Sequence, residues 1–120
     1  MKTRTFEEVW RDIEKLQGTV VETLVKHVKS DIIRVTDKGI LRRSEITEQE
    51  RLVAKSAFRR TWERLQLEGN CPVSASWKHV SGVLALLPEI EYSLKPGTIW
   101  LSENKHKFGE LVERKAAWLK

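Results

Sequence analysis

The sequence predicts an α+β fold with four helices, a three-stranded antiparallel meander and a C-terminal β-hairpin. Apolar residues recur at helical spacing in four segments of the chain. A stretch rich in Val, Ile and Thr, broken by turn signals, lies between the first two segments. An alternating pattern around Lys95-Pro96-Gly97 precedes the last one. The 120 residues suffice for one core, so we expect a single domain over residues 1–120.

The first helix is expected to begin after Thr5. Thr5-Phe6-Glu7-Glu8 has the form of a capping box, in which Thr5 accepts from a first-turn amide and Glu8 reaches back. The helix should run to about Gln17, and Gly18 suits its C-terminal end. Its apolar positions share one face and are Phe6, Val9, Trp10, Ile13 and Leu16.

The meander is expected to follow directly. Turn signals at Lys29-Ser30-Asp31 and Asp37-Lys38-Gly39 divide the β-prone stretch into three strands. The second turn is the better defined, because glycine adopts a positive φ without strain. The predicted strands are Val20–Val28, Ile32–Thr36 and Ile40–Arg43.

A long second helix is predicted from a second capping box, Thr47-Glu48-Gln49-Glu50. It should reach Leu67 or Glu68 and stop at Gly69-Asn70, and the segment from Gly69 to Ala75 should be a loop. Its buried stripe is Ala54, Phe58, Thr61, Trp62 and Leu65. A basic side carries Arg51, Lys55 and Arg59 at i, i+4, i+8 spacing, widened by Arg60 and Arg64.

The last third should form a helix, a hairpin and a final helix. Ser76 can cap a helix that Pro88 ends, with Trp77, Val80, Leu84 and Leu87 on one face. Glu89–Leu94 and Thr98–Leu101 alternate around the Lys-Pro-Gly turn as a hairpin. Ser102 should cap a last helix whose apolar stripe is Phe108, Leu111, Val112, Ala116 and Leu119.

Charge favours an anionic partner. The chain has 22 Lys and Arg against 17 Asp and Glu, a net charge of +5. We expect a small, non-enzymatic module that binds nucleic acid, with double-stranded DNA as the expected partner. The phosphate contacts are assigned to a basic surface of Arg42, Arg43, Arg51, Lys55 and Arg59. The alternative interpretation is a solvated helix face, because Glu48, Glu50 and Glu63 are interleaved with these cations.

The order helix, loop, helix and hairpin over residues 47–101 resembles winged-helix DNA-binding domains. The resemblance implies that the helix after Ser76 enters the major groove and that the hairpin touches the backbone. The matching residues are Trp77, Lys78, His79 and Ser81 on the helix and Lys95 on the wing, of which Lys78, His79 and Lys95 are the candidate DNA contacts. The other interpretation is a core helix followed by an ordinary hairpin.

Two further functions stay open. The first is a protein-interaction domain, with a homodimer formed through the apolar last helix. The second is a metal-dependent nuclease, since Glu89 and Glu103-Asn104-Lys105 resemble the split acidic and E-x-K signature of restriction-type nucleases. A helix start also favours glutamate, which gives Glu103 a structural explanation.

Other site types have little support in the sequence. Cys71 is the single cysteine, so no internal disulfide is possible and a reducing, cytoplasmic setting is expected. The three histidines are far apart, and we expect no catalytic residues, metal or cofactor. The N-terminus has no apolar signal-peptide core, and no apolar run is long enough to span a bilayer, so no membrane partner is expected.

Overall fold

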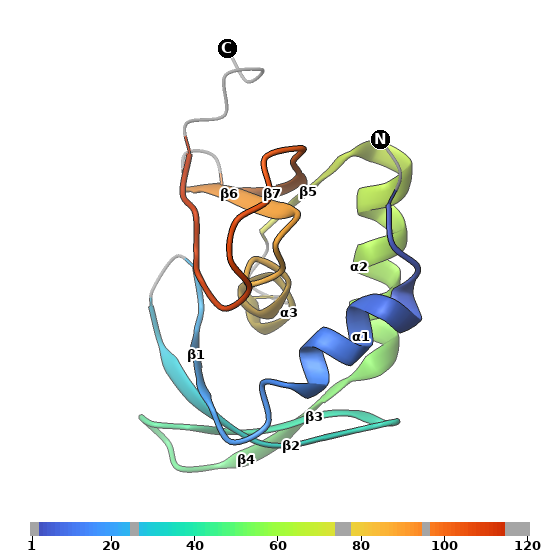
Figure 1. The fold of residues 1–120 in the computed structure, drawn as a ribbon. Coiled ribbons are helices and arrows are strands. Elements are labelled where there is room, and N and C mark those ends of the chain that lie inside the picture. Colours follow the sequence, from blue (N-terminus) through green and yellow to red (C-terminus); the bar gives the residue numbers. More distant parts are fainter. Residues whose placement is uncertain (1–2, 25–26, 74–77, 95–96, 115–120) are drawn as a thin grey trace.

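The computed structural model describes residues 3–24, 27–73, 78–94 and 97–114, which form three helices and two sheets (Figure 1). The first sheet has four antiparallel strands, in the order β1 (Val20–Glu22), β2 (Lys29–Thr36), β3 (Gly39–Ser44) and β4 (Glu50–Ala54). The second has the order β5 (Asn70–Pro72), β7 (Gly97–Leu101) and β6 (Ile90–Leu94). The helices are α1 (Phe6–Glu14), α2 (Lys55–Glu68) and α3 (Lys78–Leu84). The fold is α+β, but the predicted four helices with a three-stranded meander are wrong.

Helix α1 begins where the sequence predicts. The Glu8 amide donates to the Thr5 hydroxyl oxygen at 3.3 Å, and the Thr5 amide donates to a Glu8 carboxylate oxygen at 3.1 Å. These two bonds are the expected capping box. The helix ends at Glu14, one turn before the predicted Gln17. Its buried face consists of Phe6, Val9, Trp10 and Ile13.

The start predicted for the second helix, at Thr47, is wrong. The residues after the turn form β4, which pairs with β3 along its whole length. Glu48 lies in the turn with φ 58°, a left-handed conformation that a right-handed helix cannot contain. Helix α2 therefore begins only at Lys55. Pairing with a neighbouring strand outweighs the local capping signal, because it gives the backbone groups partners along the whole segment.

Helix α2 ends as the sequence predicts. Gly69 has φ 82°, which glycine adopts without a Cβ clash, and its amide donates to the Leu65 carbonyl at 2.8 Å. The buried face of the helix is Ala57, Phe58, Trp62 and Leu65. None of the described helices, of which α2 is the longest, has the length and apolar character needed to cross a lipid bilayer.

The first predicted strand is too long. Strand β1 stops at Glu22, because a turn closes between Thr23 and Val28. The Thr23 amide donates to the Val28 carbonyl, and the Val28 amide donates to the Thr23 hydroxyl, both at 3.0 Å. His27 lies inside this turn with φ 52°. The Thr23 hydroxyl thus accepts from the Val28 amide, which in a continued strand would have bonded to a neighbouring strand.

The second sheet contains the predicted hairpin and one strand that was not predicted. Strands β6 and β7 pair in the expected antiparallel register, from Ile90↔Leu101 to Leu94↔Gly97. The tip residues Lys95 and Pro96 lie outside the described residues. Strand β5 forms in the segment predicted as a loop and pairs with β7. This strand has three residues and ends at Pro72. Such a short segment that contains a proline gives little β signal in the sequence, so it was not predicted.

The predicted last helix is absent from the described residues, which end at Arg114. The backbone after β7 bonds to other elements instead. The His106 amide donates to the Pro88 carbonyl at 2.9 Å, and the Tyr92 amide donates to the Val112 carbonyl at 3.1 Å. Phe108 is partly buried against the core. Leu111 is partly buried in the same way, so these apolar residues of the predicted stripe contact the core from an irregular segment.

Helix α3 lies between the two sheets, as Figure 1 shows, and is part of the core. Every residue from Val80 to Leu84 is buried. Gly82 is so close to β1 that an added Cβ would lie 2.5 Å from the Glu22 carbonyl oxygen. A recognition helix must project from the surface to enter a groove. The winged-helix interpretation of this segment is therefore unsupported, and Trp77 falls outside the described residues.

Candidate functional site

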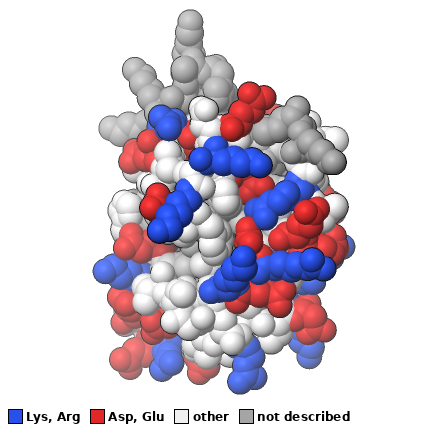
Figure 2. All heavy atoms as spheres, in the orientation of Figure 1, with Lys and Arg blue, Asp and Glu red and all other residues white. Residues whose placement is uncertain are grey.

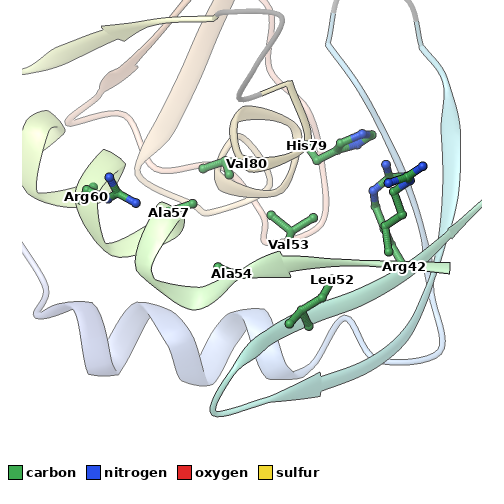
Figure 3. Close-up of a pocket in the computed structure, with 9 residues that line it drawn as sticks. Arg42, Leu52, Val53, Ala54, Ala57, Arg60, His79 and Val80 are labelled. Carbon is green, nitrogen blue, oxygen red and sulfur yellow. The ribbon is translucent and has the colours of Figure 1, made fainter.

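A pocket of about 290 Å³ lies where β3, β4, α3 and the first turn of α2 meet (Figure 3). The side chains of Arg42 and His79 lie on one side of it and Arg60 on the other, with apolar side chains between them. We call it the basic pocket. It is lined by Arg42, Arg51, Leu52, Val53, Ala54, Ala57, Arg60, His79 and Val80. None of these nine residues is acidic.

The sheet register places two arginines side by side in the pocket. Arg42 on β3 is directly opposite Arg51 on β4. The next pair on the same face of the sheet is Ile40 opposite Val53. Opposite residues of an antiparallel pair share a face, and alternate residues of a strand share it too. Ile40 is buried, so both arginines lie on the inner face of the sheet, at the end where the core opens. Like charges in this position repel each other.

Arg42 is incompletely paired. One of its terminal nitrogens donates to the Ser30 hydroxyl at 3.2 Å. Its Nε–H is buried and has no acceptor among the described residues. Burial, and then the nearby Arg51 charge, lower the pKa of the Arg42 guanidinium. A buried donor without a partner costs free energy, and an anion in the pocket would supply the missing acceptor and the counter-charge.

The N-terminus of α2 adds to the positive field. Its N-cap is Ala54, which has no side-chain oxygen to accept from the first-turn amides, and the first turn contains no acidic residue. Both Ala54 and Ala57 line the basic pocket. The Lys55 amide donates to the Lys38 carbonyl at 2.9 Å, but no side-chain cap or first-turn carboxylate offsets the partial positive charge of this helix end.

His79 completes the pocket from α3. Burial, followed by the Arg42 and Lys78 charges, lowers the pKa of its imidazole from 6.5 to about 4. The ring is neutral at pH 7, when it can donate one N–H without adding repulsion to the arginines. The low pKa follows first from the burial of the ring and second from the two neighbouring cations.

The structure divides the predicted basic surface into separate parts. Arg42, Arg51 and His79 meet in the basic pocket, but Arg43 points to the opposite face of the same sheet. Lys55 lies over the Trp10 ring at 5.2 Å, and Arg59 lies over the Phe6 ring at 5.0 Å. These two cations thus pack against α1 instead of joining the pocket. Lys78 is exposed at the start of α3, and Lys95 lies outside the described residues.

The surface does not form one broad basic patch on the face in Figure 2, where Lys and Arg alternate with Asp and Glu. Arg59, for example, pairs with Glu7 at 3.5 Å, and Arg64 pairs with Glu68 at 2.6 Å. What separates the basic pocket from this mixed surface is that its cations converge on a hollow. Sequence analysis counted Arg60 only as part of a helix face, since the signal that it borders a pocket is three-dimensional.

The nuclease residues have structural partners. The two carboxylate oxygens of Glu89 each accept from the Arg4 guanidinium at 2.7 Å, and the side chain is buried. Glu103 and Lys105 are exposed. No group of three or more metal-ligating side chains occurs among the described residues. Arg4 therefore gives Glu89 a structural counter-charge, and the three residues of the proposed nuclease signature do not form a metal-binding group in the described part of the chain.

Comparison with known proteins gave no relatives. No protein-family model, no curated protein and no solved structure matches this chain.

Proposed function

We propose that this protein binds nucleic acid by holding a backbone phosphate in the basic pocket. The observation that carries the proposal is the convergence of Arg42, Arg51 and Arg60 on one hollow whose lining contains no carboxylate. Guanidinium groups match the oxygens of a phosphate in pairs, and this is the commonest use of clustered arginines. The uncapped N-terminus of α2 favours the same negative charge.

The size of the pocket is compatible with the proposed ligand. At about 290 Å³ it has room for a phosphate group of a larger molecule. Phosphate contacts give affinity without reading bases, so the proposed binding is insensitive to sequence.

The protein-interaction alternative has lost its main support. The apolar last helix that was to form a homodimer is absent from the described residues. The large exposed apolar side chains lie on separate elements and are Val20, Ile46, Leu52 and Leu67. Single exposed apolar residues are normal on a monomer.

The direct test is a binding titration with a fluorescent oligonucleotide at low and at physiological salt. The double substitution Arg42→Gln/Arg51→Gln should weaken binding by about tenfold or more and reduce its salt dependence, because phosphate contacts are lost. The matched control is Arg34→Gln/Arg43→Gln. It removes the same two charges from the outer face of the same sheet, where both side chains are exposed.

The control separates the pocket from net charge. If the basic pocket holds the phosphate, the outer-face variant should bind within about twofold of the parent protein. Equal losses in the two variants would mean that binding follows overall charge alone. No binding by the parent protein at low salt would refute nucleic acid as the ligand.

A further inference from the structure

A second hollow adjoins the basic pocket along α2. It has a volume of about 180 Å³ and is lined by Ala57, Arg60, Thr61, Arg64 and Cys71. Ala57 and Arg60 line both hollows. The two therefore follow one side of the helix, from its N-terminus toward β5, with Arg60 at their common boundary.

The second hollow also offers cations to a ligand. Arg60 and Arg64 are one helical turn apart, which is about 6 Å along the axis. The Thr61 hydroxyl donates to the Ala57 carbonyl at 3.0 Å, so its hydrogen is already committed and only its oxygen lone pairs face a ligand. Arg64 pairs with Glu68 at 2.6 Å, and both side chains are about half exposed. Water weakens such an exposed pair, which allows a phosphate to compete for Arg64.

We infer that the two hollows form one track that takes a single strand of nucleic acid, with one phosphate in the basic pocket and the next over Arg60 and Arg64. This inference rests on the proposed function. Cations along a groove that follow the backbone are the usual means of holding a single strand.

The shape of the site favours a single strand over a duplex. The cations lie in hollows with partly apolar walls, to which Val53 and Val80 contribute. A single strand can turn its sugars and bases toward such walls, whereas a duplex keeps its bases stacked inside.

The test compares thymidine oligonucleotides that carry one or two phosphates, by calorimetric titration of the full chain. Adding the second phosphate should raise the affinity by about tenfold, because the second contact forms within the bound molecule. The double substitution Arg64→Gln/Glu68→Gln should abolish that gain. It leaves the net charge unchanged, so a loss cannot come from altered overall charge. Glu68→Gln alone frees Arg64 and should increase the gain.

A competition between a thymidine strand and a self-complementary duplex of equal length completes the test. Preference for the strand by about tenfold, together with loss of the two-phosphate gain in Arg64→Gln/Glu68→Gln, would establish the track. Equal affinity for strand and duplex, or an unchanged gain in that variant, would overturn it. Those results would leave the proposed function intact as long as Arg42→Gln/Arg51→Gln still weakens binding. Binding that is unaffected by Arg42→Gln/Arg51→Gln would refute the proposed function itself.

Discussion

Arg42 carries a partly buried guanidinium that faces Arg51, and its hydrogen bond among the described residues goes to Ser30. Its buried Nε–H has no acceptor there, and leaving a buried donor unsatisfied is unfavourable for the fold. Residues of this kind are typical of sites where stability is given up for function. Replacing Arg42 by an apolar residue should therefore raise the free energy of unfolding while it weakens binding.

The double substitution Arg42→Met/Ser30→Ala tests this trade-off. Met keeps most of the side-chain volume without the charge, and Ala removes the hydroxyl that would lose its partner. We expect the free energy of unfolding to rise by about 1 kcal/mol and oligonucleotide binding to fall by at least about tenfold. Urea unfolding and anisotropy titrations measure the two effects. A less stable variant would show that Arg42 is a structural residue.

His79 makes a prediction about pH. Its pKa is about 4 in the folded protein and 6.5 in an unperturbed chain, so between these values the unfolded state binds a proton that the native state does not. The free energy of unfolding should therefore fall as the pH drops from 6.5 toward 4. For a half-exposed ring we expect a loss on the order of 1 kcal/mol.

The control for this effect is His79→Gln, which cannot take up the proton. Urea unfolding of both proteins at neutral pH and near pH 4.5 gives the difference. The carboxylates titrate equally in the two proteins, so the variant should lose less stability than the parent. Parallel pH profiles would show that burial and the neighbouring cations do not lower the pKa of the ring.

At the scale of elements, the open N-terminus of α2 is the feature that stability alone does not explain. Ala54 occupies a position where Ser, Thr, Asp or Asn is strongly preferred, and replacing such a cap by alanine costs about 1 kcal/mol. A side chain there would stand in the basic pocket. Alanine keeps the helix end open to an anion.

Two substitutions of Ala54 separate capping from binding. Ala54→Ser and Ala54→Asp should each stabilise the protein by about 1 kcal/mol, measured by urea unfolding. Asp also brings a negative charge to the lining of the pocket and should weaken oligonucleotide binding severalfold more than Ser does. Equal binding by the two variants would mean that the bound phosphate is far from this helix end.

Local signals predicted the elements whose partners are close in sequence. The capping box at Thr5 and the hairpin around Lys95-Pro96-Gly97 were correct. The capping box at Thr47 was overridden by strand pairing, and the backbone after Ser102 bonds to Pro88 and to Tyr92 on β6 instead of forming the predicted helix. Long-range contacts decided both segments, and no periodicity within the segment reports such contacts.

The candidate site, too, could be predicted only in part, because its residues are brought together by long-range strand pairing. Arg42 and Arg51 were predicted as members of a wide surface that included Arg43 and Lys55, and His79 was predicted only as a groove contact of the winged-helix interpretation. With β4 assigned as a helix, the facing pair Arg42↔Arg51 could not be seen. The alternation of strand faces, which separates Arg43 from Arg42, becomes usable only once the register is known.

At the scale of the whole molecule, Arg4 ties the N-terminal segment to the second sheet. Its guanidinium binds both oxygens of Glu89, and a terminal nitrogen also donates to Asp12 on α1 at 2.8 Å. Glu89 is 6% exposed, so water does little to weaken the pair. The ion pair thus holds together two regions 85 residues apart in sequence.

Glu89→Gln tests whether this carboxylate is structural. It leaves Arg4 partly buried without its counter-charge, and the free energy of unfolding should fall by about 2 kcal/mol. Binding of nucleic acid should not change, because Glu89 does not line the basic pocket. The exposed pair Arg64–Glu68 provides the comparison, and Glu68→Gln should leave stability unaltered. An unchanged stability in Glu89→Gln would instead return Glu89 to the list of functional residues.

The most direct measurement of the central claim is an NMR titration of the ¹⁵N-labelled protein with a thymidine oligonucleotide, following the Arg42 Nε–H signal. This buried donor has no acceptor among the described residues, and it should shift as a phosphate oxygen reaches it, saturating together with overall binding. Assignment by Arg42→Lys identifies the signal. A signal that stays in place while the oligonucleotide binds would show that the phosphate lies elsewhere and would contradict the account.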